Sequence, residues 1–147
     1  TGFINDGDGP PSNLVNGSSA TNGSSHACTS HVQATSGQYM LFAFSTAKII
    51  SECRWIQQNG HSGGVWKWQG SNDNSTYTDI GTSFTLGNSQ PSQLHTELNG
   101  NTTAYTYYRL FGVSGNTQAS DWIREVEFKT ASVTGKEARL HGWAVNY

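Results

Sequence analysis

The sequence predicts an all-β sandwich with little helix, and three observations support this prediction. Gly, Ser, Thr and Asn together make up more than two fifths of the 147 residues, whereas charged residues make up only 12%. Such a composition is typical of short strands joined by many turns. No stretch of ten or more residues carries an apolar stripe at the helical period of about 3.6 residues. Finally, the five Trp and six Tyr supply enough apolar area to fold a core.

The chain begins with a loop-rich entrance, residues 1–38, in which Gly, Ser, Asn, Asp and Pro dominate. From Tyr39 onward, runs rich in aromatic and β-branched residues alternate with turn-forming residues, which is the pattern of strands. The length is typical of one domain. We therefore assign 1–147 to a single β-sandwich domain with a C-terminal extension at 131–147. Strands are expected at 39–45, 48–58, 65–70, 77–85, 103–113, 122–130 and 138–146.

Two of these runs break the alternation that a half-buried strand needs. In Ile50–Cys53 and in Ile123–Val126 the apolar residues at the two ends are three positions apart, so they would face opposite sides of a regular strand. A β-bulge in each segment would return both residues to one face. The predicted core then comprises Ile50, Trp55, Trp68, Ile80, Phe84, Leu110, Ile123, Val126 and Phe128.

The charges and motifs argue against several classes of function. The formal net charge is −2 and no segment concentrates the eight basic residues, so we expect no nucleic-acid binding and no attachment to an anionic membrane. The longest apolar run, Met40–Phe44, is too short to span a bilayer. The five His are scattered, and no motif for a catalytic nucleophile stands out. We therefore expect a protein that is not an enzyme.

Four segments follow one another in a characteristic order. The first reads Gly-Gln-Tyr-Met-Leu-Phe-Ala-Phe from Gly37, and the second Trp-Gln-Gly-Ser-Asn-Asp from Trp68, with Tyr-Thr at 77–78. The third reads Tyr-Tyr-Arg-Leu from Tyr107 and the fourth Ile-Arg-Glu-Val-Glu-Phe from Ile123. In this order they resemble the discoidin-like or coagulation-factor C-type domains and the related carbohydrate-binding modules of the galactose-binding-like fold.

The resemblance implies an eight-stranded jelly-roll β-sandwich that binds its ligand through loops at one end. Many carbohydrate-binding relatives also hold a structural Ca²⁺ with an Asp-Gly-x-x-x-Thr loop and a Glu from the closing strand. Here Asn16 and Thr21 have the spacing of that loop, and Glu125 matches the Glu. The resemblance therefore implies a calcium site. The alternative is a hydrogen-bonded polar loop in which Asn16 makes an Asx turn. One departure from the family is Asn74, which stands where its turn has Gly.

Sugar recognition needs an aromatic face for the apolar side of a pyranose and planar polar groups for its hydroxyls. Trp122 and Trp66 lie at junctions between a loop and a strand, and Asp121, Asn116 and His61 lie in the adjoining loops. These five are the candidate ligand-binding residues. The alternatives are packing of Trp66 in the core and ordinary solvated loop positions for the three polar residues.

The two cysteines and two of the arginines suggest structural roles. Cys28 and Cys53 either form a disulfide or leave Cys53 as a small buried apolar residue, and the sequence does not decide between these. Arg109 and Arg124 lie in expected strands, where a buried charge needs a partner. The candidate partners are Glu52, Glu125 and Glu127.

Our leading hypothesis is a non-catalytic, lectin-like module that recognises cell-surface glycans. It would belong to a larger extracellular protein or to a virion or phage tail protein, with a role in cell adhesion or receptor binding. The alternative is a structural or assembly domain of a multi-subunit spike, fibre or capsid that has no ligand site. In either case we expect the extension at 131–147 to pack on a neighbouring domain or a partner subunit, in the latter case giving a homo-oligomer.

Overall fold

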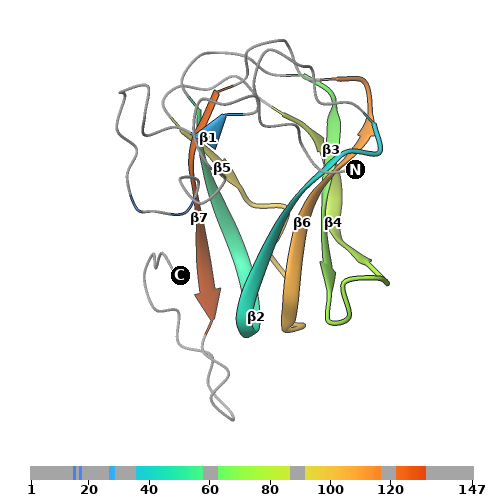
Figure 1. Cartoon of the computed structure of the whole chain (residues 1–147), viewed down its shortest axis with the longest axis vertical. Coiled ribbons are helices and arrows are strands. Elements are labelled where there is room, and N and C mark those ends of the chain that lie inside the picture. The colour runs from blue at the N-terminus through green and yellow to red at the C-terminus, as the bar shows by residue number, and fades with distance from the viewer. Residues whose placement is uncertain are drawn as a thin grey trace.

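The computed structural model describes residues 15, 17, 27–28, 36–57, 63–86, 92–116 and 122–131. The fold of these residues is built from β-strands (Figure 1). They form β1 (Ala27–Cys28), β2 (Tyr39–Gln57), β3 (Val65–Ser71), β4 (Thr78–Thr85), β5 (Ser92–His95), β6 (Tyr105–Ser114) and β7 (Trp122–Ala131). No α-helix occurs in this part of the chain, and none of its elements is a helix that could span a membrane. The predicted all-β class is confirmed.

All strand pairs are antiparallel, in the order β1-β7-β2-β6-β3-β4, and β5 pairs with β2. The 19 residues of β2 belong to both layers of the sandwich. Its first part pairs with β6, and its second part pairs with β7 and β5. In Figure 1 this strand descends, bends, and rises again, so that both of its ends lie at the same end of the molecule. The sequence had predicted two separate strands here, at 39–45 and 48–58, and the structure corrects them to one bent strand.

The bend of β2 coincides with a shift in its register with β6, between Ala43 and Lys48. The buried Tyr108 of β6 holds this bend through its hydroxyl. The hydroxyl donates to the carbonyl of Lys48 (2.7 Å) and accepts from the backbone N–H of Ile50 (3.2 Å) and from Nδ2 of Asn101 (3.1 Å). The backbone groups that the bend frees from the ladder are thereby paired.

Aromatic side chains join the two layers. The ring of Phe128 on β7 lies 4.8 Å from that of Phe42 on β2, edge to face, and 5.9 Å from the indole of Trp68 on β3. Such edge-to-face contacts add about 0.5–1.5 kcal/mol each to the stabilisation from burial. The predicted core is confirmed, because eight of its nine residues are buried and Phe84, which is half-buried, packs against them.

Both predicted β-bulges are present. The register between β2 and β7 shifts between Ile50 and Glu52, and it shifts again where β7 skips Arg124 between Ile123 and Glu125. Each shift lies inside one of the two segments whose apolar residues are three positions apart. As a result, the apolar residues at both ends of each segment are buried in the same core.

Three further comparisons concern β5, Cys53 and the C-terminal extension. The four-residue strand β5, with Leu94 as its one apolar residue, was not predicted. Cys53 is a free thiol buried in the core, in line with the small apolar residue that was one of its two readings. Burial raises its pKa well above the usual range. The strand expected at 138–146 and the extension beyond Ala131 lie outside the described residues.

The prediction that each strand arginine pairs with a glutamate is wrong for Arg109. Glu127 pairs with Arg54 (2.6 Å) and Glu52 with Lys129 (3.0 Å). Arg109 has no ion pair with a glutamate among the residues that the structure describes. Its guanidinium is held instead by an amide and by aromatic rings on the face of its own sheet, as shown below. The side chain of Arg124 lies outside the description.

Candidate binding end of the sandwich

Three of the candidate ligand residues come from elements that meet at one end of the sandwich. Because β3 and β6 are antiparallel, with Val65 opposite Ser114, the beginning of β3 lies beside the end of β6. The beginning of β7 joins the same end through β2, since Ile123 lies opposite Gln57. This is the upper end of the molecule in Figure 1. The topology therefore brings Asn116, Trp122 and Trp66 toward one end, although they are far apart in sequence.

Glycines allow two backbones to touch at this end. Gly64 (φ 73°) precedes β3, and Gly115 (φ 69°) follows β6. A Cβ on Gly115 would lie 3.2 Å from the Cα of Gly64, and a Cβ on Gly64 would lie 3.3 Å from the backbone nitrogen of Asn116. Larger residues would push the two segments apart. The pair of glycines therefore fixes the position of the exposed Asn116 relative to the segment that leads into β3.

Trp66 is a core residue. Only 1% of its surface is exposed, and its Nε1–H donates to the carbonyl of Gly63 (2.9 Å), so both its apolar face and its polar atom are used within the protein. Gly63 and Gly64 also exchange backbone hydrogen bonds with Leu86, each 3.2 Å long, which fastens this turn to the end of β4. The structure thus places Trp66 beneath the candidate site, where it has no face open to a ligand.

The other candidates can be placed only in part. Asn116 is exposed at the end of β6. Trp122 begins β7, opposite Cys28 of β1, but its side chain lies outside the description. Asp121 and His61 also lie outside the described residues.

Glu125 is a carboxylate inside the protein. Its side chain is fully buried, and its Oε1 accepts a hydrogen bond from the backbone N–H of Gly17 (3.2 Å). A buried carboxylate needs partners of this kind or a cation. Asn16 and Thr21, the other two expected calcium ligands, lie outside the described residues. Within the described ranges, no cluster of three or more His, Cys, Asp and Glu side chains could hold a metal ion.

The turn at the opposite end, between β3 and β4, is closed by its own side chains. Oδ1 of Asp73 accepts hydrogen bonds from the backbone N–H groups of Ser75 and Thr76, both 2.8 Å long, which hold the pKa of Asp73 well below its usual range. Asn74 adopts the left-handed φ of 56° at the position where the family's turn has Gly. Asn is one of the few residues that tolerate this conformation. The turn is therefore structural.

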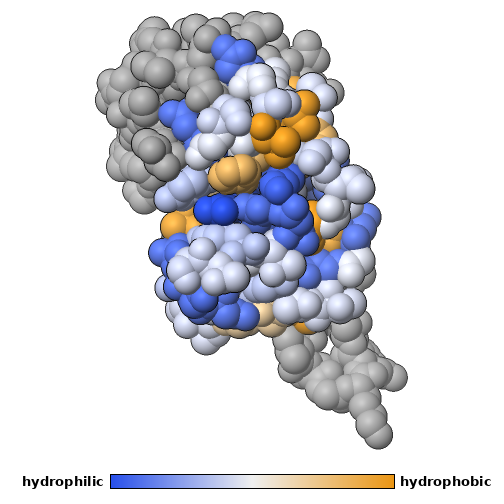
Figure 2. Space-filling model, turned by 90° about the vertical axis from the view of Figure 1, so that its right-hand side faces the viewer, coloured by the Kyte–Doolittle hydropathy of each residue, from blue (hydrophilic) through white to orange (hydrophobic). Residues whose placement is uncertain are grey.

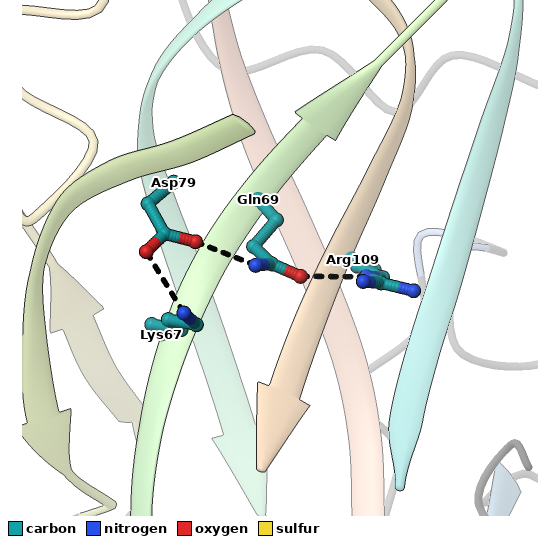
Figure 3. A network of polar contacts seen from close by, with 4 residues as sticks. All are labelled: Lys67, Gln69, Asp79 and Arg109. Carbon is teal, nitrogen blue, oxygen red and sulfur yellow. Dashed lines mark hydrogen bonds and ion pairs between the residues drawn. The ribbon is translucent and has the colours of Figure 1, made fainter. Parts of the chain in front are cut away.

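A polar network crosses the outer face of the sheet formed by β2, β6, β3 and β4 (Figure 3). Nζ of Lys67 donates to Oδ2 of Asp79 (2.8 Å), and Nε2 of Gln69 donates to Oδ1 of the same carboxylate (2.5 Å). These bonds lower the pKa of Asp79, the one from Gln69 most. Nε of Arg109 in turn donates to Oε1 of Gln69 (2.7 Å). Figure 2 views this side of the molecule, where strongly hydrophilic and apolar residues lie side by side. The sequence reasoning did not find this network, because it expected glutamate partners for Arg109.

Neither a protein-family model nor a curated protein matches the sequence significantly. Solved structures do match. CBM32 of AlyQ in complex with 4,5-unsaturated mannuronic acid has a TM-score of 0.59 and 25% identity, covering 85% of this chain and 88% of that chain. Truncated AlyQ with CBM32 and alginate lyase domains has a TM-score of 0.60 and 25% identity, and the match covers 86% of this chain and 30% of that chain. CpGH89CBM32-6 produced by Clostridium perfringens has a TM-score of 0.52 and 15% identity, and the match covers 81% of this chain and 83% of that chain.

Proposed function

The chain has the galactose-binding-like β-sandwich fold of the CBM32 carbohydrate-binding modules, and from this premise we propose that it is a non-catalytic carbohydrate-binding module. The observation that carries the proposal is the convergence of β6, β3 and β7 at one end, where the exposed Asn116 is fixed beside the entrance to β3. Rigid strands that present polar and aromatic loop residues at one end suit the recognition of a sugar.

Within this site we assign a role to each candidate residue except the buried Trp66. The indole of Trp122 offers a flat face to the apolar side of a pyranose ring, and Asp121, Asn116 and His61 hydrogen-bond its hydroxyls. One sugar buries little surface, so a single site binds weakly, and useful affinity comes from several copies acting together. The proposed ligand is a glycan on a cell surface, and the module would belong to a larger extracellular or virion protein that adheres through it.

We also propose a structural Ca²⁺ held by Asn16, Thr21 and Glu125. The buried carboxylate of Glu125 beside the backbone of Gly17 fits a hard cation, which prefers oxygen ligands. A bound ion would offset the cost of burying this charge and would fix the segment around Gly17 on β7.

A glycan array tests the proposed function. The labelled, multimerised protein is applied with Ca²⁺ and again with a chelator. We expect reproducible binding to one class of sugar, and loss of that binding in Trp122→Ala with an unchanged circular dichroism spectrum. A blank array with a folded protein would overturn the proposal and would favour the assembly domain.

A matched pair of variants locates the site. Asn116→Ala and Asn99→Ala remove the same exposed side chain at opposite ends of the sandwich, because Asn99 lies in the turn before β6. We expect Asn116→Ala to weaken binding and Asn99→Ala to leave it unchanged, with the midpoint of thermal unfolding recorded for both. Equal effects would argue against a site at the loop end, which is the end of the sandwich where β6 ends and β3 and β7 begin.

A further inference from the structure

Arg109 occupies an aromatic slot on the outer face of the sheet. The central carbon of its guanidinium lies 3.6 Å from the ring centre of Tyr77, 4.8 Å from that of Phe111 and 5.2 Å from that of Tyr39. Cation–π contacts of this kind attract the guanidinium to the faces of the rings. The three rings come from three segments of the sheet face, so the slot exists only in the folded protein.

The hydrogen bonds of the network fix the orientation of this guanidinium and leave most of it unused. Nε of Arg109 is bonded to Gln69, whose amide is anchored on Asp79, which is itself paired with Lys67. An arginine carries five N–H donors, and four of them are on the two Nη atoms. No described residue accepts a hydrogen bond from either Nη atom of Arg109. Neither Nη atom is among the buried polar atoms that lack a hydrogen-bond partner. The Nη edge therefore faces solvent, and in Figure 3 it points away from Gln69.

A guanidinium edge that is held in one orientation matches a planar carboxylate. It can donate two parallel N–H···O bonds, and little side-chain entropy is lost because stacking and the bond to Gln69 already restrict the side chain. Charge favours an anion here as well, since Lys67 and Arg109 outnumber Asp79 on this face. Two exposed apolar side chains, Leu41 (38% exposed) and Val113 (39%), flank the slot and offer contact to the apolar face of a sugar.

We propose that the Arg109 slot is a second carbohydrate subsite, and that it binds the carboxylate of a uronic acid in an acidic polysaccharide. This inference rests on the proposed function and goes beyond it in naming an acidic sugar and a separate surface. Arg109 lies five residues before Ser114 on β6, which places it about 17 Å from the loop end at about 3.4 Å per residue. A chain of several sugars could therefore contact both surfaces, and the repeated carboxylates of a polymer would raise a weak affinity.

The test uses two tetrasaccharides that differ only at C6. β-1,4-linked tetramannuronate carries carboxylates and β-1,4-linked tetramannose carries hydroxymethyl groups, and each is titrated into the ¹⁵N-labelled wild-type protein. We expect the Nε–Hε signal of Arg109 and the side-chain amide of Gln69 to shift with the acidic tetramer and not with the neutral one. Added salt should reduce the shift, because the ion pair between the Arg109 guanidinium and the sugar carboxylate would be accessible to solvent.

The other outcomes separate the two proposals. Shifts confined to Gly64, Gly115 and Asn116 would overturn the second subsite and leave the carbohydrate-binding module intact. Equal shifts at Arg109 with both tetramers would overturn the role of the carboxylate. Equal shifts with a hexaglutamate peptide would also overturn the inference, since the slot would then suit an acidic protein. No shift anywhere, together with a blank glycan array, would overturn both proposals.

A pair of conservative variants provides the second readout. Arg109→Lys keeps the charge but loses the planar donor edge, and we expect it to weaken the binding of tetramannuronate about five-fold. Arg54→Lys makes the same change on the opposite layer, where Arg54 pairs with Glu127, and should leave the affinity unchanged. Equal affinities of Arg109→Lys and the wild type would overturn the inference.

Discussion

The imidazole of His95 is confined among aromatic rings. It stacks on Trp55 at 6.0 Å with an interplanar angle of 10°, and its edge meets Phe84 at 4.7 Å. His95 is 3% exposed, and neither ring nitrogen has a hydrogen-bond partner among the described residues. Burial therefore favours the neutral ring and lowers its pKa from 6.5 to about 4.

This pKa predicts loss of stability in mild acid. The unfolded chain binds a proton at His95 below about pH 6.5 while the native state does not, so the contribution is complete above pH 6.5 and disappears as the pH falls toward 4. The loss is about 3 kcal/mol over this window. We expect His95→Phe to flatten the dependence of the unfolding free energy on pH between 4 and 6.5 in urea titrations. A variant with the same slope as the wild type would show that another group is responsible.

Gly81 makes a closer approach than any larger residue would allow. It has a φ of 67°, and a Cβ there would collide with the backbone carbonyl of Glu97. Gly100 has a similar φ of 88° with nothing within 4 Å, which makes it a matched control. We expect Gly100→Ala to cost about 1 kcal/mol from left-handed strain alone. Gly81→Ala should cost at least about 2 kcal/mol more because β4 must move. Equal losses in denaturant unfolding would contradict this contact.

At the scale of elements, the bend of β2 depends on one hydroxyl. Tyr108→Phe removes the partner of Ile50 N–H and of the Lys48 carbonyl, and we expect a loss of about 1–3 kcal/mol in the free energy of unfolding. The neighbouring Tyr107 points to the other face of β6, so Tyr107→Phe is the control and should change stability by less than about 0.5 kcal/mol. An unchanged Tyr108→Phe would mean that water satisfies these groups.

The sequence predicts elements well where apolar spacing determines them. The breaks of alternation at Ile50–Cys53 and Ile123–Val126 predict both bulges, because burial of their apolar residues requires them. Strand β5 could not be predicted from apolar spacing, because Leu94, its one apolar residue, is exposed. The strand pairs along the edge of β2. The partners of Arg109 could not be predicted either, because strand register, which the sequence does not state, decides that Gln69 lies opposite. For the candidate site, the topology explains why Asn116 and the starts of β3 and β7 lie at one end, while the role of a single residue such as Trp66 depends on side-chain packing.

At the scale of the whole molecule, the proposed Ca²⁺ should stabilise the fold. A ligand that binds only the native state at one hundred times its dissociation constant adds about 2.7 kcal/mol. We expect saturating Ca²⁺ to raise the midpoint of thermal unfolding relative to the chelator-treated protein, and Glu125→Gln to abolish that rise. Glu52→Gln, which breaks the pair with Lys129 on the same layer, should retain it. Equal midpoints with Ca²⁺ and with chelator would contradict the site.

The shared strand also determines how the molecule comes apart. Because β2 is hydrogen-bonded in both layers, unfolding of β2 in one layer also disrupts the strand that it contributes to the other layer. Amide hydrogens of β2, β6 and β7 should therefore exchange only through global unfolding, all with the same free energy of opening. Those of β4, at the edge of its layer, and of the short β5 should exchange through local opening. A continuous strand at the centre makes the two layers a single cooperative unit.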